Sequence, residues 1–212
     1  MPISFLSNEQ RESYGRYTGA PSLDDLARYF HLDDSDLALI AQKRGEHNRL
    51  GFAVQLCTVR YLGTFLEDPL TVPTQVLHTL AKQLRIAIIP DAHLYSASRQ
   101  RLQHAAEIQT HYGYVEITER RIGFRLTRWL YALCWTGTDR PTVLFERSVT
   151  WLVTHKVLLP GCSTLERYIA HLRSRVEERL WHSLGRGISS EQQGKLESLL
   201  LVPTGSRSSP LD

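Results

Sequence analysis

Apolar side chains recur along this chain at intervals of three and four residues, which is the spacing of one face of an α-helix. The stretch between Glu46 and Leu62 shows the pattern well, with apolar residues at Leu50, Ala53, Val54, Cys57 and Tyr61. Alternation of apolar and polar residues, the pattern of a half-buried strand, is nearly absent. The hydrophobic pattern therefore predicts an all-α fold.

Capping residues and helix breakers divide this pattern into separate helices. Ser, Thr or Asp precedes several of the apolar runs, and Gly or Pro follows most of them. Ser163 with Glu166 has the spacing of a capping box, which predicts the start of the longest helix. On this basis we expect helices at about residues 8–15, 23–30, 34–44, 46–62, 74–84, 98–112, 118–135, 141–158, 163–184 and 190–201.

The strongest breaks divide the helices into two groups and a tail. Gly63 and the pair Asp68-Pro69 end the first group, residues 1–68, and the second group spans residues 70–188. Residues 189–212 are expected to form a short helix followed by a linker rich in Pro, Gly and Ser. We therefore expect two helical modules of the helix-turn-helix type, joined by a short linker.

The formal charge of +3 hides an uneven distribution. Residues 1–70 carry 7 Lys and Arg against 10 Asp and Glu, a net charge of −3, whereas residues 71–212 carry 18 against 12, a net charge of +6. Of the 25 basic residues, 21 are Arg, whose planar guanidinium suits phosphate and guanine edges. A GC-rich genome would produce the same bias, so composition favours nucleic acid without excluding other partners.

Cysteine usage and hydropathy restrict the compartment. Cys57, Cys134 and Cys162 are odd in number, far apart and flanked by apolar neighbours, which favours reduced buried thiols over disulfides or a zinc site. The apolar runs are much shorter than a membrane span, and the first residues lack the pattern of a secretory signal. We therefore expect a cytoplasmic protein that binds no metal and no cofactor and does not enter the membrane.

The turn in front of the helix at residues 46–62 is the first candidate for DNA recognition. Arg can donate to guanine and Asn to adenine in the major groove, and the apolar side of the helix would anchor it in the protein. In this interpretation Arg49 reads bases; the alternative is a solvated helix start. The candidate residues are Lys43, Arg44, His47, Asn48 and Arg49.

A row of arginines on the helix at residues 118–135 is the second candidate. Arg121, Arg125 and Arg128 follow the i, i+4, i+7 spacing of one helix face, so their guanidinium groups would form a phosphate-binding row. The alternative is an ordinary solvated face paired with Glu116 and Glu119. Four tryptophans occupy helix positions that favour burial in the core, namely Trp129, Trp135, Trp151 and Trp181.

Residues 149–175 form the third candidate, because they read as a helix, a tight turn at Leu159-Pro160-Gly161 and a second helix. This is the outline of a helix-turn-helix, in which the second helix enters the major groove. Many helical hairpins have this outline without binding DNA, but a basic stripe on the exposed side strengthens the prediction. The candidate residues here are Ser163, Thr164, Arg167, His171 and Arg175.

Signatures of catalysis are missing. His104, Glu107 and His111 share a helix, but their spacing matches neither zinc-protease motif. The acidic residues between Asp24 and Asp36 fall at predicted helix starts, where carboxylates favour the helix dipole, and this explains them without a metal-dependent nuclease. We therefore assign no catalytic residue. RNA binding is less favoured than DNA binding, because no aromatic-rich sheet motif appears.

Five long blocks of this chain resemble, in order, the N-terminal region of transposases of the Tn-three family, the replicative class II transposons of bacteria. The resemblance extends over nearly the whole chain. The blocks are PSLDDLARYFHLDD, RGEHNRLGFAVQLCTVRYLGTFLEDP, RWLYALCWTG, RPTVLFERSVTWLVTHKVLLPG and STLERYIAHLRSRVEERLW.

The resemblance implies sequence-specific binding of duplex DNA at the terminal inverted repeats of a transposon. In this family the strands are cut by a later RNase H-like domain with metal-binding acidic residues, so we expect these residues to bind DNA without cutting it. The resemblance also leaves a second transposase subunit as a possible partner besides the DNA. The main alternative function is a helical protein-interaction module that serves dimerisation or regulation of the transposase.

Overall fold

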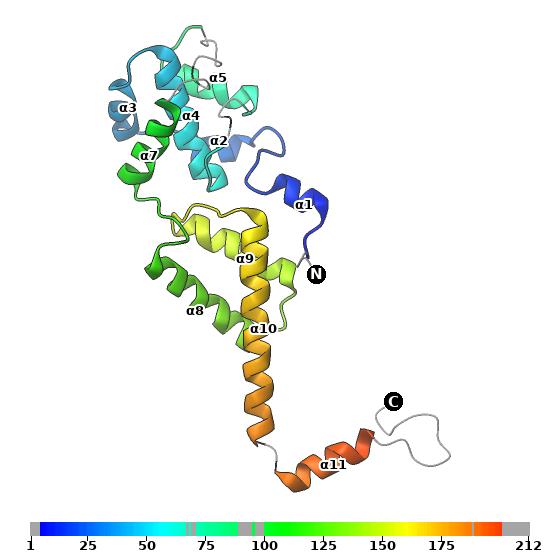
Figure 1. Cartoon of the computed structure of the whole chain (residues 1–212). Helices are drawn as coiled ribbons and strands as arrows, with labels where there is room; N and C mark the ends of the chain where they lie inside the picture. Colours follow the sequence, from blue (N-terminus) through cyan, green and yellow to red (C-terminus); the bar gives the residue numbers. More distant parts are fainter. Residues whose placement is uncertain are drawn as a thin grey trace.

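The computed structural model describes residues 5–66, 68, 71–88, 95, 100–187 and 189–200. The described residues form helices without a strand, apart from one isolated bridge, so the all-α prediction is confirmed (Figure 1). The helices are α1 (Asn8–Ser13), α2 (Leu23–Tyr29), α3 (Asp34–Ala41), α4 (Glu46–Leu62), α5 (Thr74–Gln83), α7 (Gln100–Tyr112), α8 (Arg120–Thr136), α9 (Pro141–Thr154), α10 (Cys162–Gly187) and α11 (Ser190–Leu200).

Most helix boundaries lie within about two residues of the predictions, but α3 ends at Ala41 and α9 at Thr154, three and four residues before the predicted ends. The predicted helix at residues 46–62 has the same bounds as α4, which ends at Gly63 in the left-handed conformation that favours glycine. The predicted capping box of the longest helix is wrong. Because α10 begins at Cys162, Ser163 lies inside the helix, and the Glu166 carboxylate accepts hydrogen bonds from the N-terminal segment instead.

The first hydrophobic core surrounds α4, which packs against α2, α3, α5 and α7. Its residues from Leu50 to Val59 are buried on all sides, including the polar Gln55 and Thr58. Phe30, Leu80 and Ile108 reach this core from neighbouring helices and are fully buried. α4 is therefore the central helix of the first group, and only residues near its two ends are exposed or half-buried.

The second core lies between α8, α9 and α10, which pack pairwise against one another. One face of each helix supplies the apolar side chains, as the spacing predicts. The fully buried members are Leu126, Leu130, Leu144, Leu152 and Leu165.

The two cores meet along the chain between α9 and α10. Val115 and Val157 form the isolated parallel bridge, and the Leu159 amide donates to the Gly63 carbonyl at 2.9 Å. In the helix packing, α5 and α7 lie against α4, and Leu6 joins the second core, whereas the module division near residue 68 stays a prediction. The packing thus places the change of core between α7 and α8.

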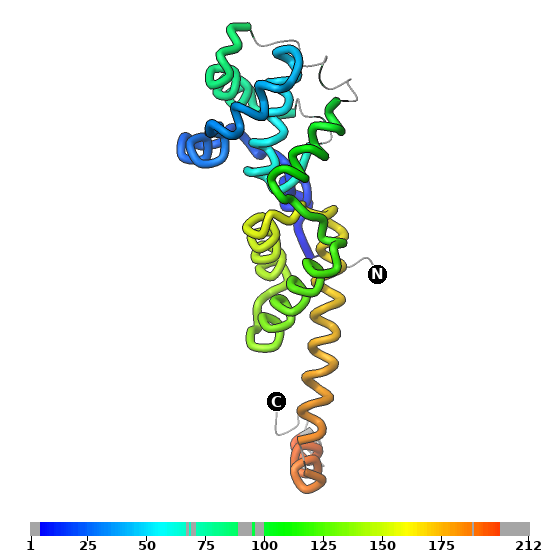
Figure 2. Tube along the Cα trace, turned by 90° about the vertical axis from the view of Figure 1, so that its left-hand side faces the viewer, coloured from blue at the N-terminus to red at the C-terminus, as the bar shows by residue number. Residues whose placement is uncertain are grey.

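The molecule is elongated, because α10 runs past α8 and α9 towards α11 (Figure 2). Leu180 is half-buried, but from Trp181 to Gly187 the residues of this helix are exposed, with Trp181 at 71% and Leu184 at 50%. The prediction that all four tryptophans are core residues is therefore wrong for Trp181 and for Trp135, which is 40% exposed. Only Trp151 is buried.

Candidate nucleic-acid interface

The turn before α4 is less open than its sequence suggests. The Lys43 ammonium lies 2.5 Å from a Glu107 carboxylate oxygen on α7 and 4.7 Å from the centre of the Phe52 ring. With only 10% of its side chain exposed, Lys43 ties α7 to the start of α4. This position does not favour a contact with DNA.

Asn48 and Arg49 are also engaged inside the protein. Asn48 is buried, and its side-chain amide donates to the Arg44 carbonyl at 2.7 Å. The half-buried Arg49 donates weakly to the Leu84 carbonyl at 3.4 Å. Asn48 is therefore poorly placed to read bases, whereas base reading by the half-buried Arg49 stays a prediction. Arg44 is exposed and His47 is half-buried, which leaves these two as the accessible members of the first candidate set.

The second candidate set lies on an open surface. Arg121, Arg125 and Arg128 are exposed on α8, while Ile122, Leu126 and Leu130 on the other side of the same helix are buried. Within the described residues these arginines have no carboxylate partner, and the pairing with Glu116 and Glu119 that the alternative interpretation requires does not form. The Arg125 guanidinium lies 5.9 Å from the centre of the Trp151 ring. The row is therefore available to phosphates.

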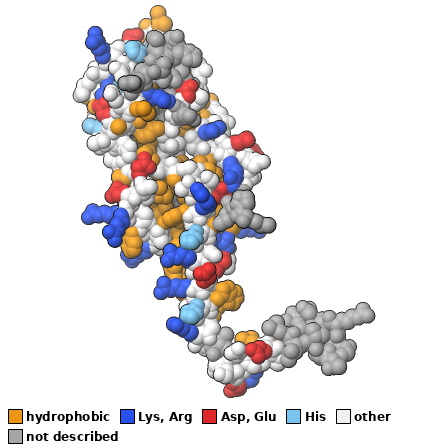
Figure 3. All heavy atoms as spheres, viewed as in Figure 1, with side chains coloured by type: hydrophobic (Ala, Val, Ile, Leu, Met, Phe, Trp, Pro, Cys, Tyr) orange, Lys and Arg blue, Asp and Glu red, His pale blue; other side chains and the backbone are white. Residues whose placement is uncertain are grey.

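The third candidate set is exposed as well. Ser163, Thr164, Arg167, His171 and Arg175 lie on the solvent side of α10, opposite the buried Leu165, Ile169 and Leu172. The Arg167 Nε donates to the Ser163 carbonyl within the helix at 3.2 Å, and the residue is exposed. Figure 3 shows Lys, Arg and His side chains following α10 along its length, with another basic group at the outer edge near the start of α8.

The connection before α10 fixes the orientation of this face. Residues 155–161 join α9 to α10, and the Val115 amide donates to Lys156 while the Leu158 amide donates to Val115, at 3.0 and 2.9 Å. Three or four residues are usual in the turn of a helix-turn-helix, so this connection is longer. α9 and α10 therefore form a helical hairpin with a seven-residue connection, and its helix-turn-helix type stays a prediction.

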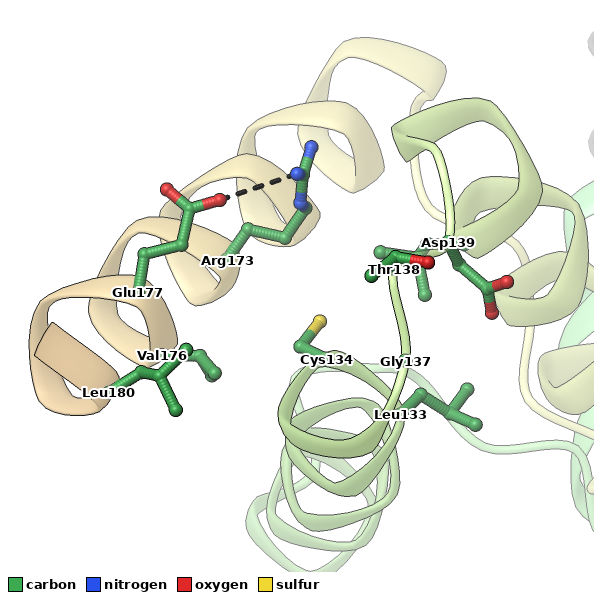
Figure 4. A pocket seen from close by; sticks show the side chains of 10 residues that line it. Leu133, Cys134, Gly137, Thr138, Asp139, Arg173, Val176, Glu177 and Leu180 are labelled. Atoms are coloured by element: carbon green, nitrogen blue, oxygen red, sulfur yellow. Dashed lines mark hydrogen bonds and ion pairs between the residues drawn. The ribbon is translucent and has the colours of Figure 1, made fainter. Parts of the chain in front are cut away.

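The pocket beside α10 does not resemble a catalytic site (Figure 4). Its volume is about 260 Å³, and Leu133, Val176 and Leu180 supply much of its lining. Arg173 and Glu177 form an ion pair at its edge, at 3.3 Å. Burial raises the pKa of the Cys134 thiol in its wall, so the thiol is protonated at neutral pH and is a poor nucleophile.

The three cysteines are free thiols, as the sequence predicts, but only Cys57 is fully buried. Cys134 and Cys162 are half-buried.

Asp36, in the acidic stretch between Asp24 and Asp36, stabilises the fold through buried hydrogen bonds. Asp36 is buried, and it accepts two hydrogen bonds from Arg60 at 2.7 and 2.8 Å and one from the Tyr112 hydroxyl at 2.6 Å. Burial alone would raise the pKa of the Asp36 carboxyl, but these hydrogen bonds outweigh it and lower the pKa.

In the described part of the chain no three His, Cys, Asp or Glu side chains are grouped as metal ligands. No helix there has the length and apolar character to span a membrane.

The site also contains residues that the sequence motifs did not single out. Phe124 and Trp135 are exposed on α8 beside the arginines, at 67% and 40%, and Tyr131 between them is half-buried and packs against the second core. Their i, i+7, i+11 spacing is visible in the sequence, and so is the absence of Asp and Glu between Arg120 and Thr136. Together these two signals could have marked α8 as a basic and aromatic surface.

Comparisons with known proteins give a consistent result. The family model described as Domain of unknown function (DUF4158) matches residues 5–172. The transposase for transposon gamma-delta of Escherichia coli K12 is 43% identical over 213 residues, which cover 100% of this chain and 21% of that protein. The transposase for transposon Tn501 of Pseudomonas aeruginosa is 34% identical, over 87% of this chain and 18% of the relative.

A third relative, the transposase for transposon Tn1546 of Enterococcus faecium, is 29% identical over 92% of this chain and 19% of its own length. The chain therefore spans about a fifth of the length of the curated relatives that it matches.

Proposed function

The chain belongs to the family described as Domain of unknown function (DUF4158) and matches the N-terminal region of Tn-three family transposases, and on this basis we propose that it binds duplex DNA at the terminal inverted repeats of a transposon. The relatives are named as transposases of transposons, so the ends of such an element are the natural DNA partner. In this proposal the protein acts on DNA in the bacterial cytoplasm and contributes recognition, while strand cutting belongs to other parts of the transposase.

The observation that carries the proposal is the pair of exposed basic rows on α8 and α10. Each row lies opposite a buried apolar face, so the hydrophobic core holds the cations at the surface. Cations without carboxylate partners gain most from phosphates, because binding releases counterions from the DNA. Both basic groups are visible in the single view of Figure 3, and the proposal requires that one duplex contacts both.

Within this surface we assign different roles to the two helices. The first turns of α10 expose Ser163, Thr164 and Arg167, and the N-terminal residues of a recognition helix are those that contact base edges. The arginines of α8 hold the backbone whatever its sequence. Arg44 and His47 at the start of α4 offer an additional contact from the first group.

A titration of the whole chain over a series of salt concentrations tests the proposal. The first probe is a duplex carrying the terminal inverted repeat of the encoding transposon, called the end duplex below, and the second is a scrambled duplex. In a variant with Arg121→Ala, Arg125→Ala and Arg128→Ala, the log-log slope of affinity against salt should fall on both duplexes, by about 0.9 for each phosphate that the variant leaves unneutralised. Arg167→Ala should reduce the preference for the end duplex.

Arg173→Ala is the matched control, because Arg173 lies on α10 but is paired with Glu177. Its salt slope should equal that of the wild type. A wild-type chain that binds both duplexes equally well contradicts the assignment to inverted repeats, and a chain that binds neither contradicts DNA binding altogether.

The projecting end of α10 favours one alternative function, a protein-interaction module. Trp181 and Leu184 lie one turn apart and remain largely exposed. Light scattering over a range of concentrations tests this alternative. Self-association that disappears in Trp181→Ser, together with no preference between the duplexes, would favour the interaction module over the DNA-binding function.

A further inference from the structure

The solvent face of α8 has a composition that a solvated helix does not need. Amphipathic surface helices carry mixed charged and polar residues on their outer side. Between Arg120 and Thr136 the sequence contains four arginines and neither Asp nor Glu. The largest of the other exposed side chains on α8 are Phe124 and Trp135, so this face combines cations with flat aromatic rings.

Phe124 is the most exposed of these rings, at 67%. It lies three residues after Arg121 and four before Arg128, so all three side chains share one face of the helix. With a rise of 1.5 Å per residue, the two arginines lie roughly 10 Å apart along the axis, and Phe124 lies between them. Further along, the Tyr131 and Trp135 rings are stacked at a centroid distance of 5.9 Å.

The charges decide which partner fits this face. An apolar protein surface would leave four guanidinium groups without counter-charge, which is costly when the interface excludes water. A nucleic acid supplies phosphates for the arginines and base faces for the ring. Proteins that bind the minor groove often insert an apolar side chain such as Phe between base pairs and hold the kinked backbone with basic residues.

We propose that Phe124 inserts between adjacent base pairs of the bound duplex and kinks it, while Arg121, Arg125 and Arg128 hold the phosphates on either side. This inference rests on the proposed function and adds that α8 deforms the DNA as well as neutralising it. The energy needed to unstack a base step depends on the step, with pyrimidine–purine steps deforming most easily. α8 therefore contributes to the choice of sequence without a hydrogen bond to a base.

The test uses the whole chain and two readouts that simple phosphate binding leaves unchanged. The end duplex is labelled with 2-aminopurine at successive positions, since the fluorescence of this base rises when it is unstacked. A second copy carries a donor and an acceptor dye at its ends, so that energy transfer reports bending. Saturating wild-type protein should raise the fluorescence at one position and increase the energy transfer.

Phe124→Ala should abolish both signals and weaken binding roughly tenfold, because alanine cannot stack on a base. Its salt slope should stay that of the wild type, since the arginines are intact. Phe124→Leu should retain much of both signals, because leucine also serves as a wedge. Leu102→Ala is the matched control, since Leu102 on α7 is also 67% exposed but lies off the basic rows, and it should leave both signals unchanged.

The outcomes separate this inference from the function on which it rests. Binding of the end duplex without any fluorescence or bending change overturns the wedge and leaves DNA binding intact. So does a Phe124→Ala variant with wild-type signals, which would mean that another side chain unstacks and bends the duplex. A wild-type chain that binds no duplex overturns both proposals. Circular dichroism of each variant shows that helix content is retained, as expected for an exposed side chain.

Discussion

Among single residues, the buried polar groups of the first core depend on one another. The Tyr95 hydroxyl lies 2.9 Å from the His104 Nδ1 and also meets the Gln55 side chain. Lys43 and Glu107 face the same imidazole. Burial and the nearby Lys43 lower the pKa of His104, against an opposing effect of Glu107. The folded protein therefore prefers the neutral imidazole.

This preference predicts a pH dependence of stability. Because the folded-state pKa of His104 lies below the unfolded value of about 6.5, the unfolded chain binds a proton first. The free energy of unfolding should be highest above pH 6.5 and should fall as the pH decreases from there towards 5. Urea titrations between pH 5 and 8 measure it, and His104→Gln should flatten this part of the curve. An identical pH profile in the variant would contradict the assignment.

Among the elements, the start of α10 is held by a contact between Glu166 and the N-terminal segment that no local sequence pattern predicts. The buried Glu166 carboxylate accepts from the Phe5 and Leu6 amides at 3.1 and 3.2 Å and pairs with Arg11 at 2.5 Å. The segment before α1 is thus fastened to the start of α10. Since Ser163, Thr164 and Arg167 flank Glu166, this contact also orients the proposed recognition residues.

Glu166→Gln should therefore destabilise the protein. The amide keeps the shape of the side chain but removes the charge and turns one acceptor into a donor, at a cost of about 1–3 kcal/mol. The urea midpoint measures the loss. Glu177→Gln is the matched control, because that exposed carboxylate pairs with Arg173 across one turn and should contribute less than about 0.5 kcal/mol. Equal midpoints for the two variants would show that the Glu166 contact contributes little.

Across the whole molecule, the two cores are joined through few but close contacts. Gly63 ends α4 with a φ of +76°, and a Cβ added there would lie 2.7 Å from a Val153 methyl group on α9. Its carbonyl accepts from the Leu159 amide. The first group thus meets the second at a point where only glycine satisfies both the backbone and the available space.

A pair of glycine variants separates these two requirements. Gly113 also has a positive φ, of +72°, but a Cβ there would meet nothing within 4 Å. Gly113→Ala should cost only the conformational strain, about 1 kcal/mol. Gly63→Ala should cost roughly 1–3 kcal/mol more, because it also disturbs the packing between the cores. Thermal denaturation of both variants measures the difference, and equal losses would mean that the cores are not tightly joined at Gly63.

The helices, the family and the amphipathic faces of α8 and α10 follow from the sequence alone. The helices and their faces depend on neighbours within one or two turns, so local spacing suffices to predict them. The family follows from the similarity of long sequence blocks. The bounds of α4 and the exposed arginines of α8 are examples. The helix-turn-helix type, the module boundaries and the DNA contacts remain predictions.

Which charged side chains stay available depends on the tertiary structure. Lys43 is paired with Glu107, 64 residues away, and Glu166 holds the segment near Phe5, 161 residues away. Trp181 is exposed although its spacing resembles that of a core residue, because α10 extends beyond the helices that would cover it. A pattern along one helix records which side chains could be buried, whereas burial and pairing depend on what the rest of the chain places against them.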